Sequence, residues 1–128
     1  MFSPLIPDPR SHHCSCVIQS DDGTAEAVIV IGGLINRGKT NTTEIFKIGE
    51  KQWIEGPPFP CNIDGAACLS LPPPMSFACV VIGGETDDDT IDAQETSDVY
   101  GLNRSWTDWT YLGKIKKGRQ MNIVLALS

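Results

Sequence analysis

The residues best suited to bind a metal ion lie near the start of the chain, where two histidines precede two cysteines. His12, His13, Cys14 and Cys16 offer the imidazole and thiolate groups that zinc prefers. On a β-strand, His12, Cys14 and Cys16 share one face, but neighbours on that face are about 7 Å apart. Because this spacing is too wide for one tetrahedral ion, and the chain has no CxxC or HxxxH motif, we expect no metal and no cofactor.

The chain has no recognisable arrangement for nucleophilic catalysis. A serine or cysteine nucleophile needs a base and an orienting acid within reach, whereas the two histidines of the sequence are adjacent to each other. Neither a Gly-x-Ser-x-Gly motif nor a glycine loop that opens a helix is present. We therefore expect a protein that is not an enzyme and has no catalytic residues.

Acidic residues cluster between positions 85 and 98, where seven carboxylates occur without a lysine or arginine. Their spacing lacks the turn glycine and the regular alternation of a calcium-binding loop. An exposed surface loop is the simpler interpretation.

Length and composition limit the class of protein further. The 128 residues correspond to one domain, and 41% hydrophobic with 20% charged residues is typical of a globular chain. The net charge of −6 disfavours nucleic acid and anionic membranes as partners, and no apolar run approaches the roughly 20 residues of a membrane span. The start of the chain does not resemble a secretion signal. We favour a cytoplasmic protein, unless the true amino terminus lies further upstream.

Five cysteines leave one unpaired even if disulfides form. Four of them lie in apolar, strand-like sequence, where a thiol behaves as a small hydrophobic group. We therefore expect reduced thiols in the core rather than disulfides. The cysteines are Cys14, Cys16, Cys61, Cys68 and Cys79.

A pair of glycines ends an apolar run twice in the chain. Gly32-Gly33 follows the run AVIVI, and Gly83-Gly84 follows FACVVI, so the two pairs are 83 − 32 = 51 residues apart. Glycine has no Cβ, which permits positive φ and close approach of another backbone at a strand end. The apolar runs themselves are typical of strands covered on both faces.

Further matching features follow each glycine pair in the same order. Each unit contains an acidic, a β-branched and an aromatic residue in succession, Glu44-Ile45-Phe46 in the first and Asp98-Val99-Tyr100 in the second. A tryptophan comes next, at Trp53 in the first unit and at Trp106 or Trp109 in the second. Large aromatic rings are suited to filling the space between stacked sheets. The matched features predict an internal repeat with a period of about 50 residues.

Each unit contains four short β-like segments separated by turn residues, and no segment has the apolar period of a helix. We expect strands at 11–19, 25–33, 42–49 and 52–55, then at 65–71, 77–84, 97–102 and 108–112. One further strand, at 121–128, begins a third unit.

This pattern resembles the kelch repeat, in which each repeat forms one four-stranded blade of a β-propeller. The matching residues are Arg10 and Arg119 at unit starts, with Gly32, Gly33, Phe46, Trp53, Gly83, Gly84, Tyr100 and Trp109. The resemblance implies an all-β partial propeller with a lead-in at 1–10, blades at 11–61 and 62–118, and the first strand of a further blade at 119–128. Propellers close with about 4 to 8 blades. The missing blades would come from a longer chain or from other copies.

The meander order of such a blade places two sets of connections at the same end of the molecule. Loops on a rigid scaffold commonly bind ligands, so we expect a rim that binds a protein or peptide. Its predicted residues are Asn36, Arg37, Lys39, Asp87, Asp88, Asp89, Lys114, Lys116 and Lys117.

Three functions remain open at this stage. The resemblance implies an adaptor or scaffold, including substrate recognition for a ubiquitin ligase. A fragment of a kelch-type enzyme, similar to galactose oxidase or sialic-acid isomerase, is the first alternative. A structural extracellular kelch protein is the second, and oxidised cysteines or glycosylation of Asn41 or Asn103 would favour it.

Overall fold

The computed structural model describes residues 10, 11, 13–36, 38–86 and 98–114. All of the regular elements in these residues are β-strands, which confirms the predicted all-β class. The described part contains no helix long and apolar enough to cross a membrane.

The first four-stranded sheet is an antiparallel meander built from residues 14–55. Its strands are β1 (Cys14–Gln19), β2 (Ala25–Ile31), β5 (Thr43–Lys47) and β6 (Gln52–Glu55), in the order β1-β2-β5-β6. This order follows the chain: short turns join β1 to β2 and β5 to β6, whereas the longer connection 32–42 joins β2 to β5.

The second four-stranded sheet repeats the same arrangement. Its strands are β8 (Ala67–Ser70), β9 (Phe77–Ile82), β11 (Asp98–Asn103) and β12 (Trp109–Lys114), in the order β12-β11-β9-β8. The eight strands of the two sheets correspond to the eight predicted from the sequence, with shifted ends. Both sheets are open, with β1 and β6 at the edges of the first and β8 and β12 at the edges of the second.

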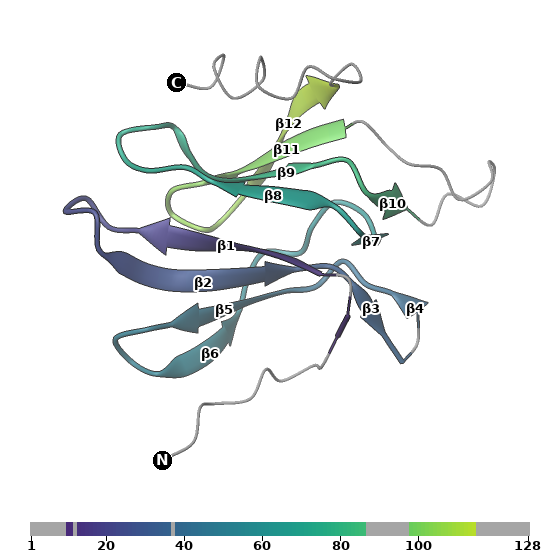
Figure 1. Cartoon of the computed structure of the whole chain (residues 1–128), viewed down its shortest axis with the longest axis horizontal. Coiled ribbons are helices and arrows are strands. Elements are labelled where there is room, and N and C mark those ends of the chain that lie inside the picture. Colours follow the sequence, from purple (N-terminus) through teal and green to yellow (C-terminus); the bar gives the residue numbers. More distant parts are fainter. Residues whose placement is uncertain (1–9, 12, 37, 87–97, 115–128) are drawn as a thin grey trace.

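Two short ribbons were not predicted. The strands β3 (Leu34–Ile35) and β4 (Gly38–Lys39) form a hairpin after the first glycine pair. The strands β7 (Ile63–Asp64) and β10 (Glu85–Thr86) pair with each other although they belong to different connections. Both ribbons lie at the right of Figure 1, whereas the turns β1–β2, β5–β6 and β8–β9 lie at the left. The right-hand side is called the connection end below, and the left-hand side the hairpin end.

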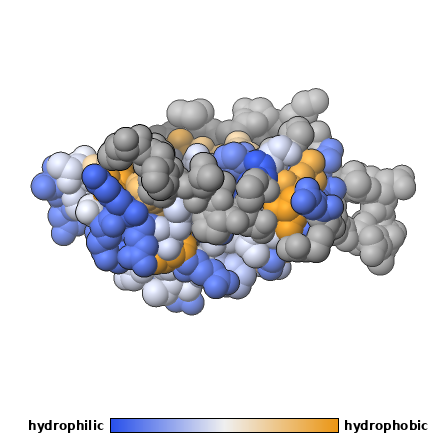
Figure 2. Space-filling view, turned by 90° about the horizontal axis from the view of Figure 1, so that it is seen from below, coloured by the Kyte–Doolittle hydropathy of each residue, from blue (hydrophilic) through white to orange (hydrophobic). Residues whose placement is uncertain are grey.

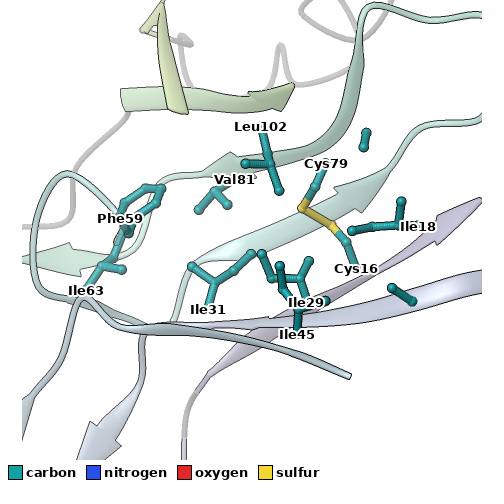
Figure 3. Packing of buried hydrophobic residues seen from close by; sticks show 12 residues of the cluster. Cys16, Ile18, Ile29, Ile31, Ile45, Phe59, Ile63, Cys79, Val81 and Leu102 are labelled. Carbon is teal, nitrogen blue, oxygen red and sulfur yellow. A yellow bond between two sulfur atoms is a disulfide. The ribbon is translucent and has the colours of Figure 1, made fainter. Parts of the chain in front are cut away.

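The two sheets share one hydrophobic core, and Figure 3 shows the side chains of both sheets meeting in it. Phe59 and Ile63, from the segment that links the sheets, complete this core with 1% and 3% exposure. Its other buried members are Cys16, Ile18, Ala27, Ile29, Ile31 and Ile45 from the first sheet and Ala78, Cys79, Val81 and Leu102 from the second.

The first glycine pair adopts the backbone that its position predicts. Gly32 and Gly33 have φ values of 63° and 102°, where only glycine is unstrained. A Cβ on Gly32 would lie 2.5 Å from the carbonyl oxygen of Ile63, and one on Gly33 would lie 2.6 Å from that of Ser11. The pair therefore allows two other segments of backbone to approach the end of β2.

The hydrogen-bond register shows which residues of the two units are equivalent. Ile31 pairs with Thr43 and Ile82 pairs with Val99, next to the first glycine of each pair. Counting from these residues places Phe46 opposite Val28 and Leu102 opposite Cys79. Leu102 therefore occupies the position of Phe46, and Tyr100 stands two residues earlier in the strand. Phe46 and Tyr100, the aromatic residues that match in the sequence, are therefore two positions apart in the register. Because side chains alternate along a strand, both still belong to the same face of their sheets.

The same register identifies the repeated tryptophan. Trp53 pairs with Phe46, and Trp109 pairs with Leu102. Trp109 is therefore the counterpart of Trp53, and Trp106 lies in the turn before β12 with a φ of 60°. The predicted strand of a third unit, within 119–128, lies outside the described residues.

The arginine that opens the first unit is fully buried and joins three chain segments. Its guanidinium donates to the carbonyls of Gly32 and Thr42 at 2.9 and 3.0 Å, and to the Glu44 carboxylate at 2.8 Å. The side chain of Arg10 is 0% exposed and that of Glu44 is 12% exposed. A buried charge of this kind is tolerated only when it is paired and hydrogen-bonded.

Replacing Arg10 by alanine is expected to lower the free energy of unfolding by about 3–5 kcal/mol, because it leaves the Glu44 carboxylate buried without its cation. Urea denaturation followed by tryptophan fluorescence measures this loss. Lys47→Ala is the control, since Lys47 pairs with Glu50 at the surface and such pairs contribute about 0–1 kcal/mol. Similar losses for both variants would show that the buried network does not stabilise the fold.

Candidate functional site

The connection end is the candidate site, because the β3–β4 and β7–β10 ribbons gather there. Lys39 of β4 lies with its Nζ 3.5 Å from Asp64 Oδ1 of β7, and the two side chains are 17% and 14% exposed. That carboxylate oxygen is buried and accepts no hydrogen bond within the described part of the chain. Glu85 of β10 pairs with Asp64 across the short ribbon and is exposed. Two acidic residues and a lysine thus lie close together at this end.

A second charged group lies at the edge of the second sheet. Lys114 donates to Asp98 Oδ1 at 2.7 Å, and the Tyr111 hydroxyl donates to the same oxygen at 3.3 Å. The hydrogen bond to Asp98 raises the pKa of Lys114, so this lysine stays charged over the physiological range. Lys114 is 66% exposed, and it remains accessible to a ligand despite its partner.

The predicted rim residues are only partly described. Asn36, Lys39 and Lys114 lie in the described part, whereas Arg37, Asp87, Asp88, Asp89, Lys116 and Lys117 lie outside it. In Figure 1, β4 and the end of β12 are both at the connection end, with β7 and β10 between them. Lys39 and Lys114 therefore share one end of the molecule but belong to separate ion pairs. Glu85 belongs to the acidic stretch 85–98 that was expected at the rim. Asp64 also belongs to this end and was not predicted, because no motif indicated the β7–β10 pairing.

Four cysteines link the two sheets through disulfides, so the expectation of reduced thiols is wrong for them. Cys14 bonds to Cys68 and Cys16 bonds to Cys79, with Cα–Cα distances of 5.7 and 6.0 Å. Both distances lie in the usual range for disulfides. The fifth cysteine, Cys61, takes part in neither bond.

The apolar sequence around each cysteine does not indicate its partner, because the bonded cysteines lie on strands of different sheets. Along β1, same-face residues are indeed about 7 Å apart. However, Cys68 and Cys79 arrive from β8 and β9, which pack against β1. The Sγ atoms of Cys16, Cys68 and Cys79 all lie within 4.8 Å of one another. The burial of Cys16 and Cys79, at 1% and 0% exposure, agrees with the predicted core position.

The linker between the sheets makes a specific contact with the second sheet. The ring of Phe59 packs edge-on against Tyr100 and Trp109, with centroids 5.0 Å apart in both cases. The indole Nε1 of Trp109 donates to the Pro57 carbonyl at 3.0 Å. Burial of Tyr100 at this contact raises the pKa of its hydroxyl. The proline-rich linker is therefore part of the inter-sheet contact.

The equivalent tryptophan of the first sheet has no such hydrogen bond in the part of the chain that the structure describes. Trp53 packs against Phe46 with centroids 5.2 Å apart. Its Nε1 is buried, yet it finds no acceptor among the described residues. A buried donor without an acceptor costs stability.

The comparisons with known proteins identify no family. No protein-family model matches the chain, and no curated protein matches it. The geometry described above is therefore the basis for any functional assignment.

Replacing each tryptophan by phenylalanine tests whether the hydrogen bond of Trp109 stabilises the fold. Trp109→Phe loses the indole hydrogen bond to the Pro57 carbonyl, which keeps the one from Thr43 Oγ1. Trp53→Phe instead removes a buried donor that has no acceptor in the described part of the chain. We expect Trp109→Phe to be the more destabilising change by about 1 kcal/mol. Both variants lose the same volume, so each serves as the control for the other in urea denaturation. Equal losses would contradict the assigned role of the Trp109 hydrogen bond.

Proposed function

We infer that the chain is a propeller-type binding module whose connection end recognises a protein or peptide. The observation that supports this best is the direction in which the two sheets stack. In the first sheet, the row Val28–Phe46–Trp53 belongs to the face opposite the shared core, because Ile29 and Ile45 belong to the core face.

The equivalent row of the second sheet faces the shared core. It consists of Cys79, Leu102 and Trp109, all of which belong to or pack on the core cluster. The two sheets therefore stack front to back. A contact between unlike faces generates a ring if its rotation closes and an open stack if it does not. Front-to-back stacking of four-stranded meanders is the arrangement that a propeller requires.

The second sheet has buried apolar residues on both of its faces, which supports continuation of this stack. Val80 and Val99 of the second sheet form a separate cluster on the face away from the shared core. Figure 2 views the molecule from the side on which β6 lies in Figure 1 and shows apolar patches among hydrophilic residues. A sheet with apolar residues on both faces is suited to a position between two neighbours. The proposed neighbours are the remaining kelch-like blades, from a longer chain or from other copies.

The mixed charge of the connection end supports binding rather than catalysis. Lys39, Asp64, Glu85 and Lys114 offer both signs of charge on a rigid scaffold. Complementary charge gives specificity and faster association with a polar protein surface. An adaptor role, including presentation of a substrate to a ubiquitin ligase, is the form of this function that the kelch resemblance suggests.

A selection from a random peptide library on the immobilised full chain tests this proposal. Synthetic copies of the selected peptides are then titrated against the purified protein. We expect the double variant Lys39→Glu with Lys114→Glu to weaken binding at least about tenfold, or ~1.4 kcal/mol. The matched control reverses Lys47 and Lys51, which lie at the hairpin end, and should bind as the unmodified chain does. Failure to select any peptide, or equal weakening in both variants, would contradict binding at this end.

The two disulfides favour a second candidate, a structural protein of an oxidising compartment. Disulfides persist mainly in secreted and periplasmic proteins and in the endoplasmic reticulum. Counting the thiols of the chain, denatured without reductant after purification from its own cells, tests this possibility. One reactive thiol per chain is the expected result, from Cys61. Five reactive thiols would instead support the cytoplasmic adaptor.

A further inference from the structure

The two disulfides lie so close together that a sulfur of one can reach the other. Cys68, which is bonded to Cys14, has its Sγ within 4.8 Å of the Sγ atoms of both Cys16 and Cys79. These two cysteines form the other disulfide, and Figure 3 shows it inside the shared core. Disulfide exchange requires a thiolate sulfur to approach a disulfide sulfur, and Cys68 holds that position for the Cys16–Cys79 bond.

The two disulfides differ in their access to solvent. Cys16 and Cys79 are 1% and 0% exposed, whereas Cys14 and Cys68 are both half-buried. Ile29 pairs with Cys16 across β1 and β2, and Figure 3 shows Ile18 beside the inner bond in the core cluster. An external thiol can therefore reach the Cys14–Cys68 bond, while the Cys16–Cys79 bond is protected from direct attack.

We propose that Cys68 is a thiol–disulfide exchange site, through which small thiols act on the buried Cys16–Cys79 disulfide. In the first step, an external thiolate attacks Cys14 Sγ. A mixed disulfide forms between the thiol and Cys14, and Cys68 leaves as a thiolate. In the second step, Cys68 attacks the inner disulfide and bonds to one of its sulfurs. The other inner cysteine leaves as a thiolate and takes up a proton, so no net oxidation or reduction occurs in this step.

The product of the second step determines whether the sheets remain covalently linked. Attack on Cys16 gives a bond between β8 and β1, and the link between the sheets is kept. Attack on Cys79 gives a bond between β8 and β9, which both belong to the second sheet. No disulfide would then join the two sheets, and only noncovalent packing would hold them together. The exchange therefore controls how tightly the two stacked sheets are connected.

A pair of variants of the full chain separates exchange through Cys68 from direct reduction. Cys14→Ser and Cys68→Ser both remove the outer disulfide, but only Cys14→Ser keeps the attacking sulfur. Both are made with Cys61→Ala, so that Cys61 takes no part and each variant has one thiol from the outer pair. Each protein is exposed to glutathione, quenched with an alkylating reagent at intervals, and mapped by mass spectrometry of its disulfide-linked peptides.

We expect the Cys16–Cys79 bond to be lost at least tenfold faster in Cys14→Ser, with bonds from Cys68 to Cys16 or Cys79 as intermediates. In Cys68→Ser the inner bond should survive until the protein unfolds, and matched thermal unfolding of the two variants controls for this. Equal rates in both variants, or loss of the inner bond without a Cys68-containing intermediate, would overturn the proposal.

The chain with all of its cysteines provides a second test if either variant fails to fold. Limiting glutathione should produce Cys68-containing intermediates before the inner thiols become reactive. Simultaneous appearance of all four thiols would contradict the exchange. The proposal would also fail if protein purified without reductant held stoichiometric zinc on four thiolates, because the inner disulfide would then not exist.

Discussion

The fold depends on apolar packing between two sheets of which neither can bury its core face alone. Ile29 and Ile45 of the first sheet meet Val81 and Leu102 of the second, and Phe59 closes the gap from the linker. Small two-stranded or single-sheet structures have marginal stability in water. Three other features lie around this contact: the disulfides, the hydrogen bond of Trp109 and the first glycine pair. Packing of the two sheets brings the partners in each of them together.

Two arginines donate to backbone carbonyls at opposite ends of the packed sheets; the side chain of Arg10 is fully buried and Arg104 is half-buried. Arg10 binds the carbonyls of Gly32 and Thr42 near the connection end. Arg104 donates to the carbonyls of Leu71 and Phe77, in the turn that joins β8 and β9. Backbone carbonyls that leave a sheet inside a protein need donors, and a guanidinium can serve several of them at once. At the exposed β1–β2 turn, the carboxylate of Asp22 accepts hydrogen bonds from Ser20 and Thr24. These hydrogen bonds lower the pKa of Asp22 to about 2.

The sequence predicted what depends on local pattern and missed what depends on the meeting of distant segments. Alternation, turn residues and glycine pairs were sufficient to locate all eight strands of the two sheets. The equivalence of Phe46 and Tyr100 was misjudged, because residue type is a weaker guide to register than the hydrogen bonds beside the glycines. The disulfides were missed, since each joins strands of different sheets whose proximity arises only from stacking. The pairing of Asp64 with Glu85, which continues the register of β8 with β9, was also missed. The spacing of residues in the sequence did not indicate that the rim residues Lys39 and Lys114 form ion pairs with Asp64 and Asp98.

Front-to-back stacking has a consequence for how such a chain can evolve. In the proposed propeller every unit offers one face of each kind, so duplication of a unit would insert a new sheet without requiring any new contact surface. The number of units is then limited by the angle between successive sheets rather than by the chemistry of their contact. Small changes in the residues that set this angle, such as the linker prolines beside Phe59, would change the size of the assembly while its repeating contact stayed the same.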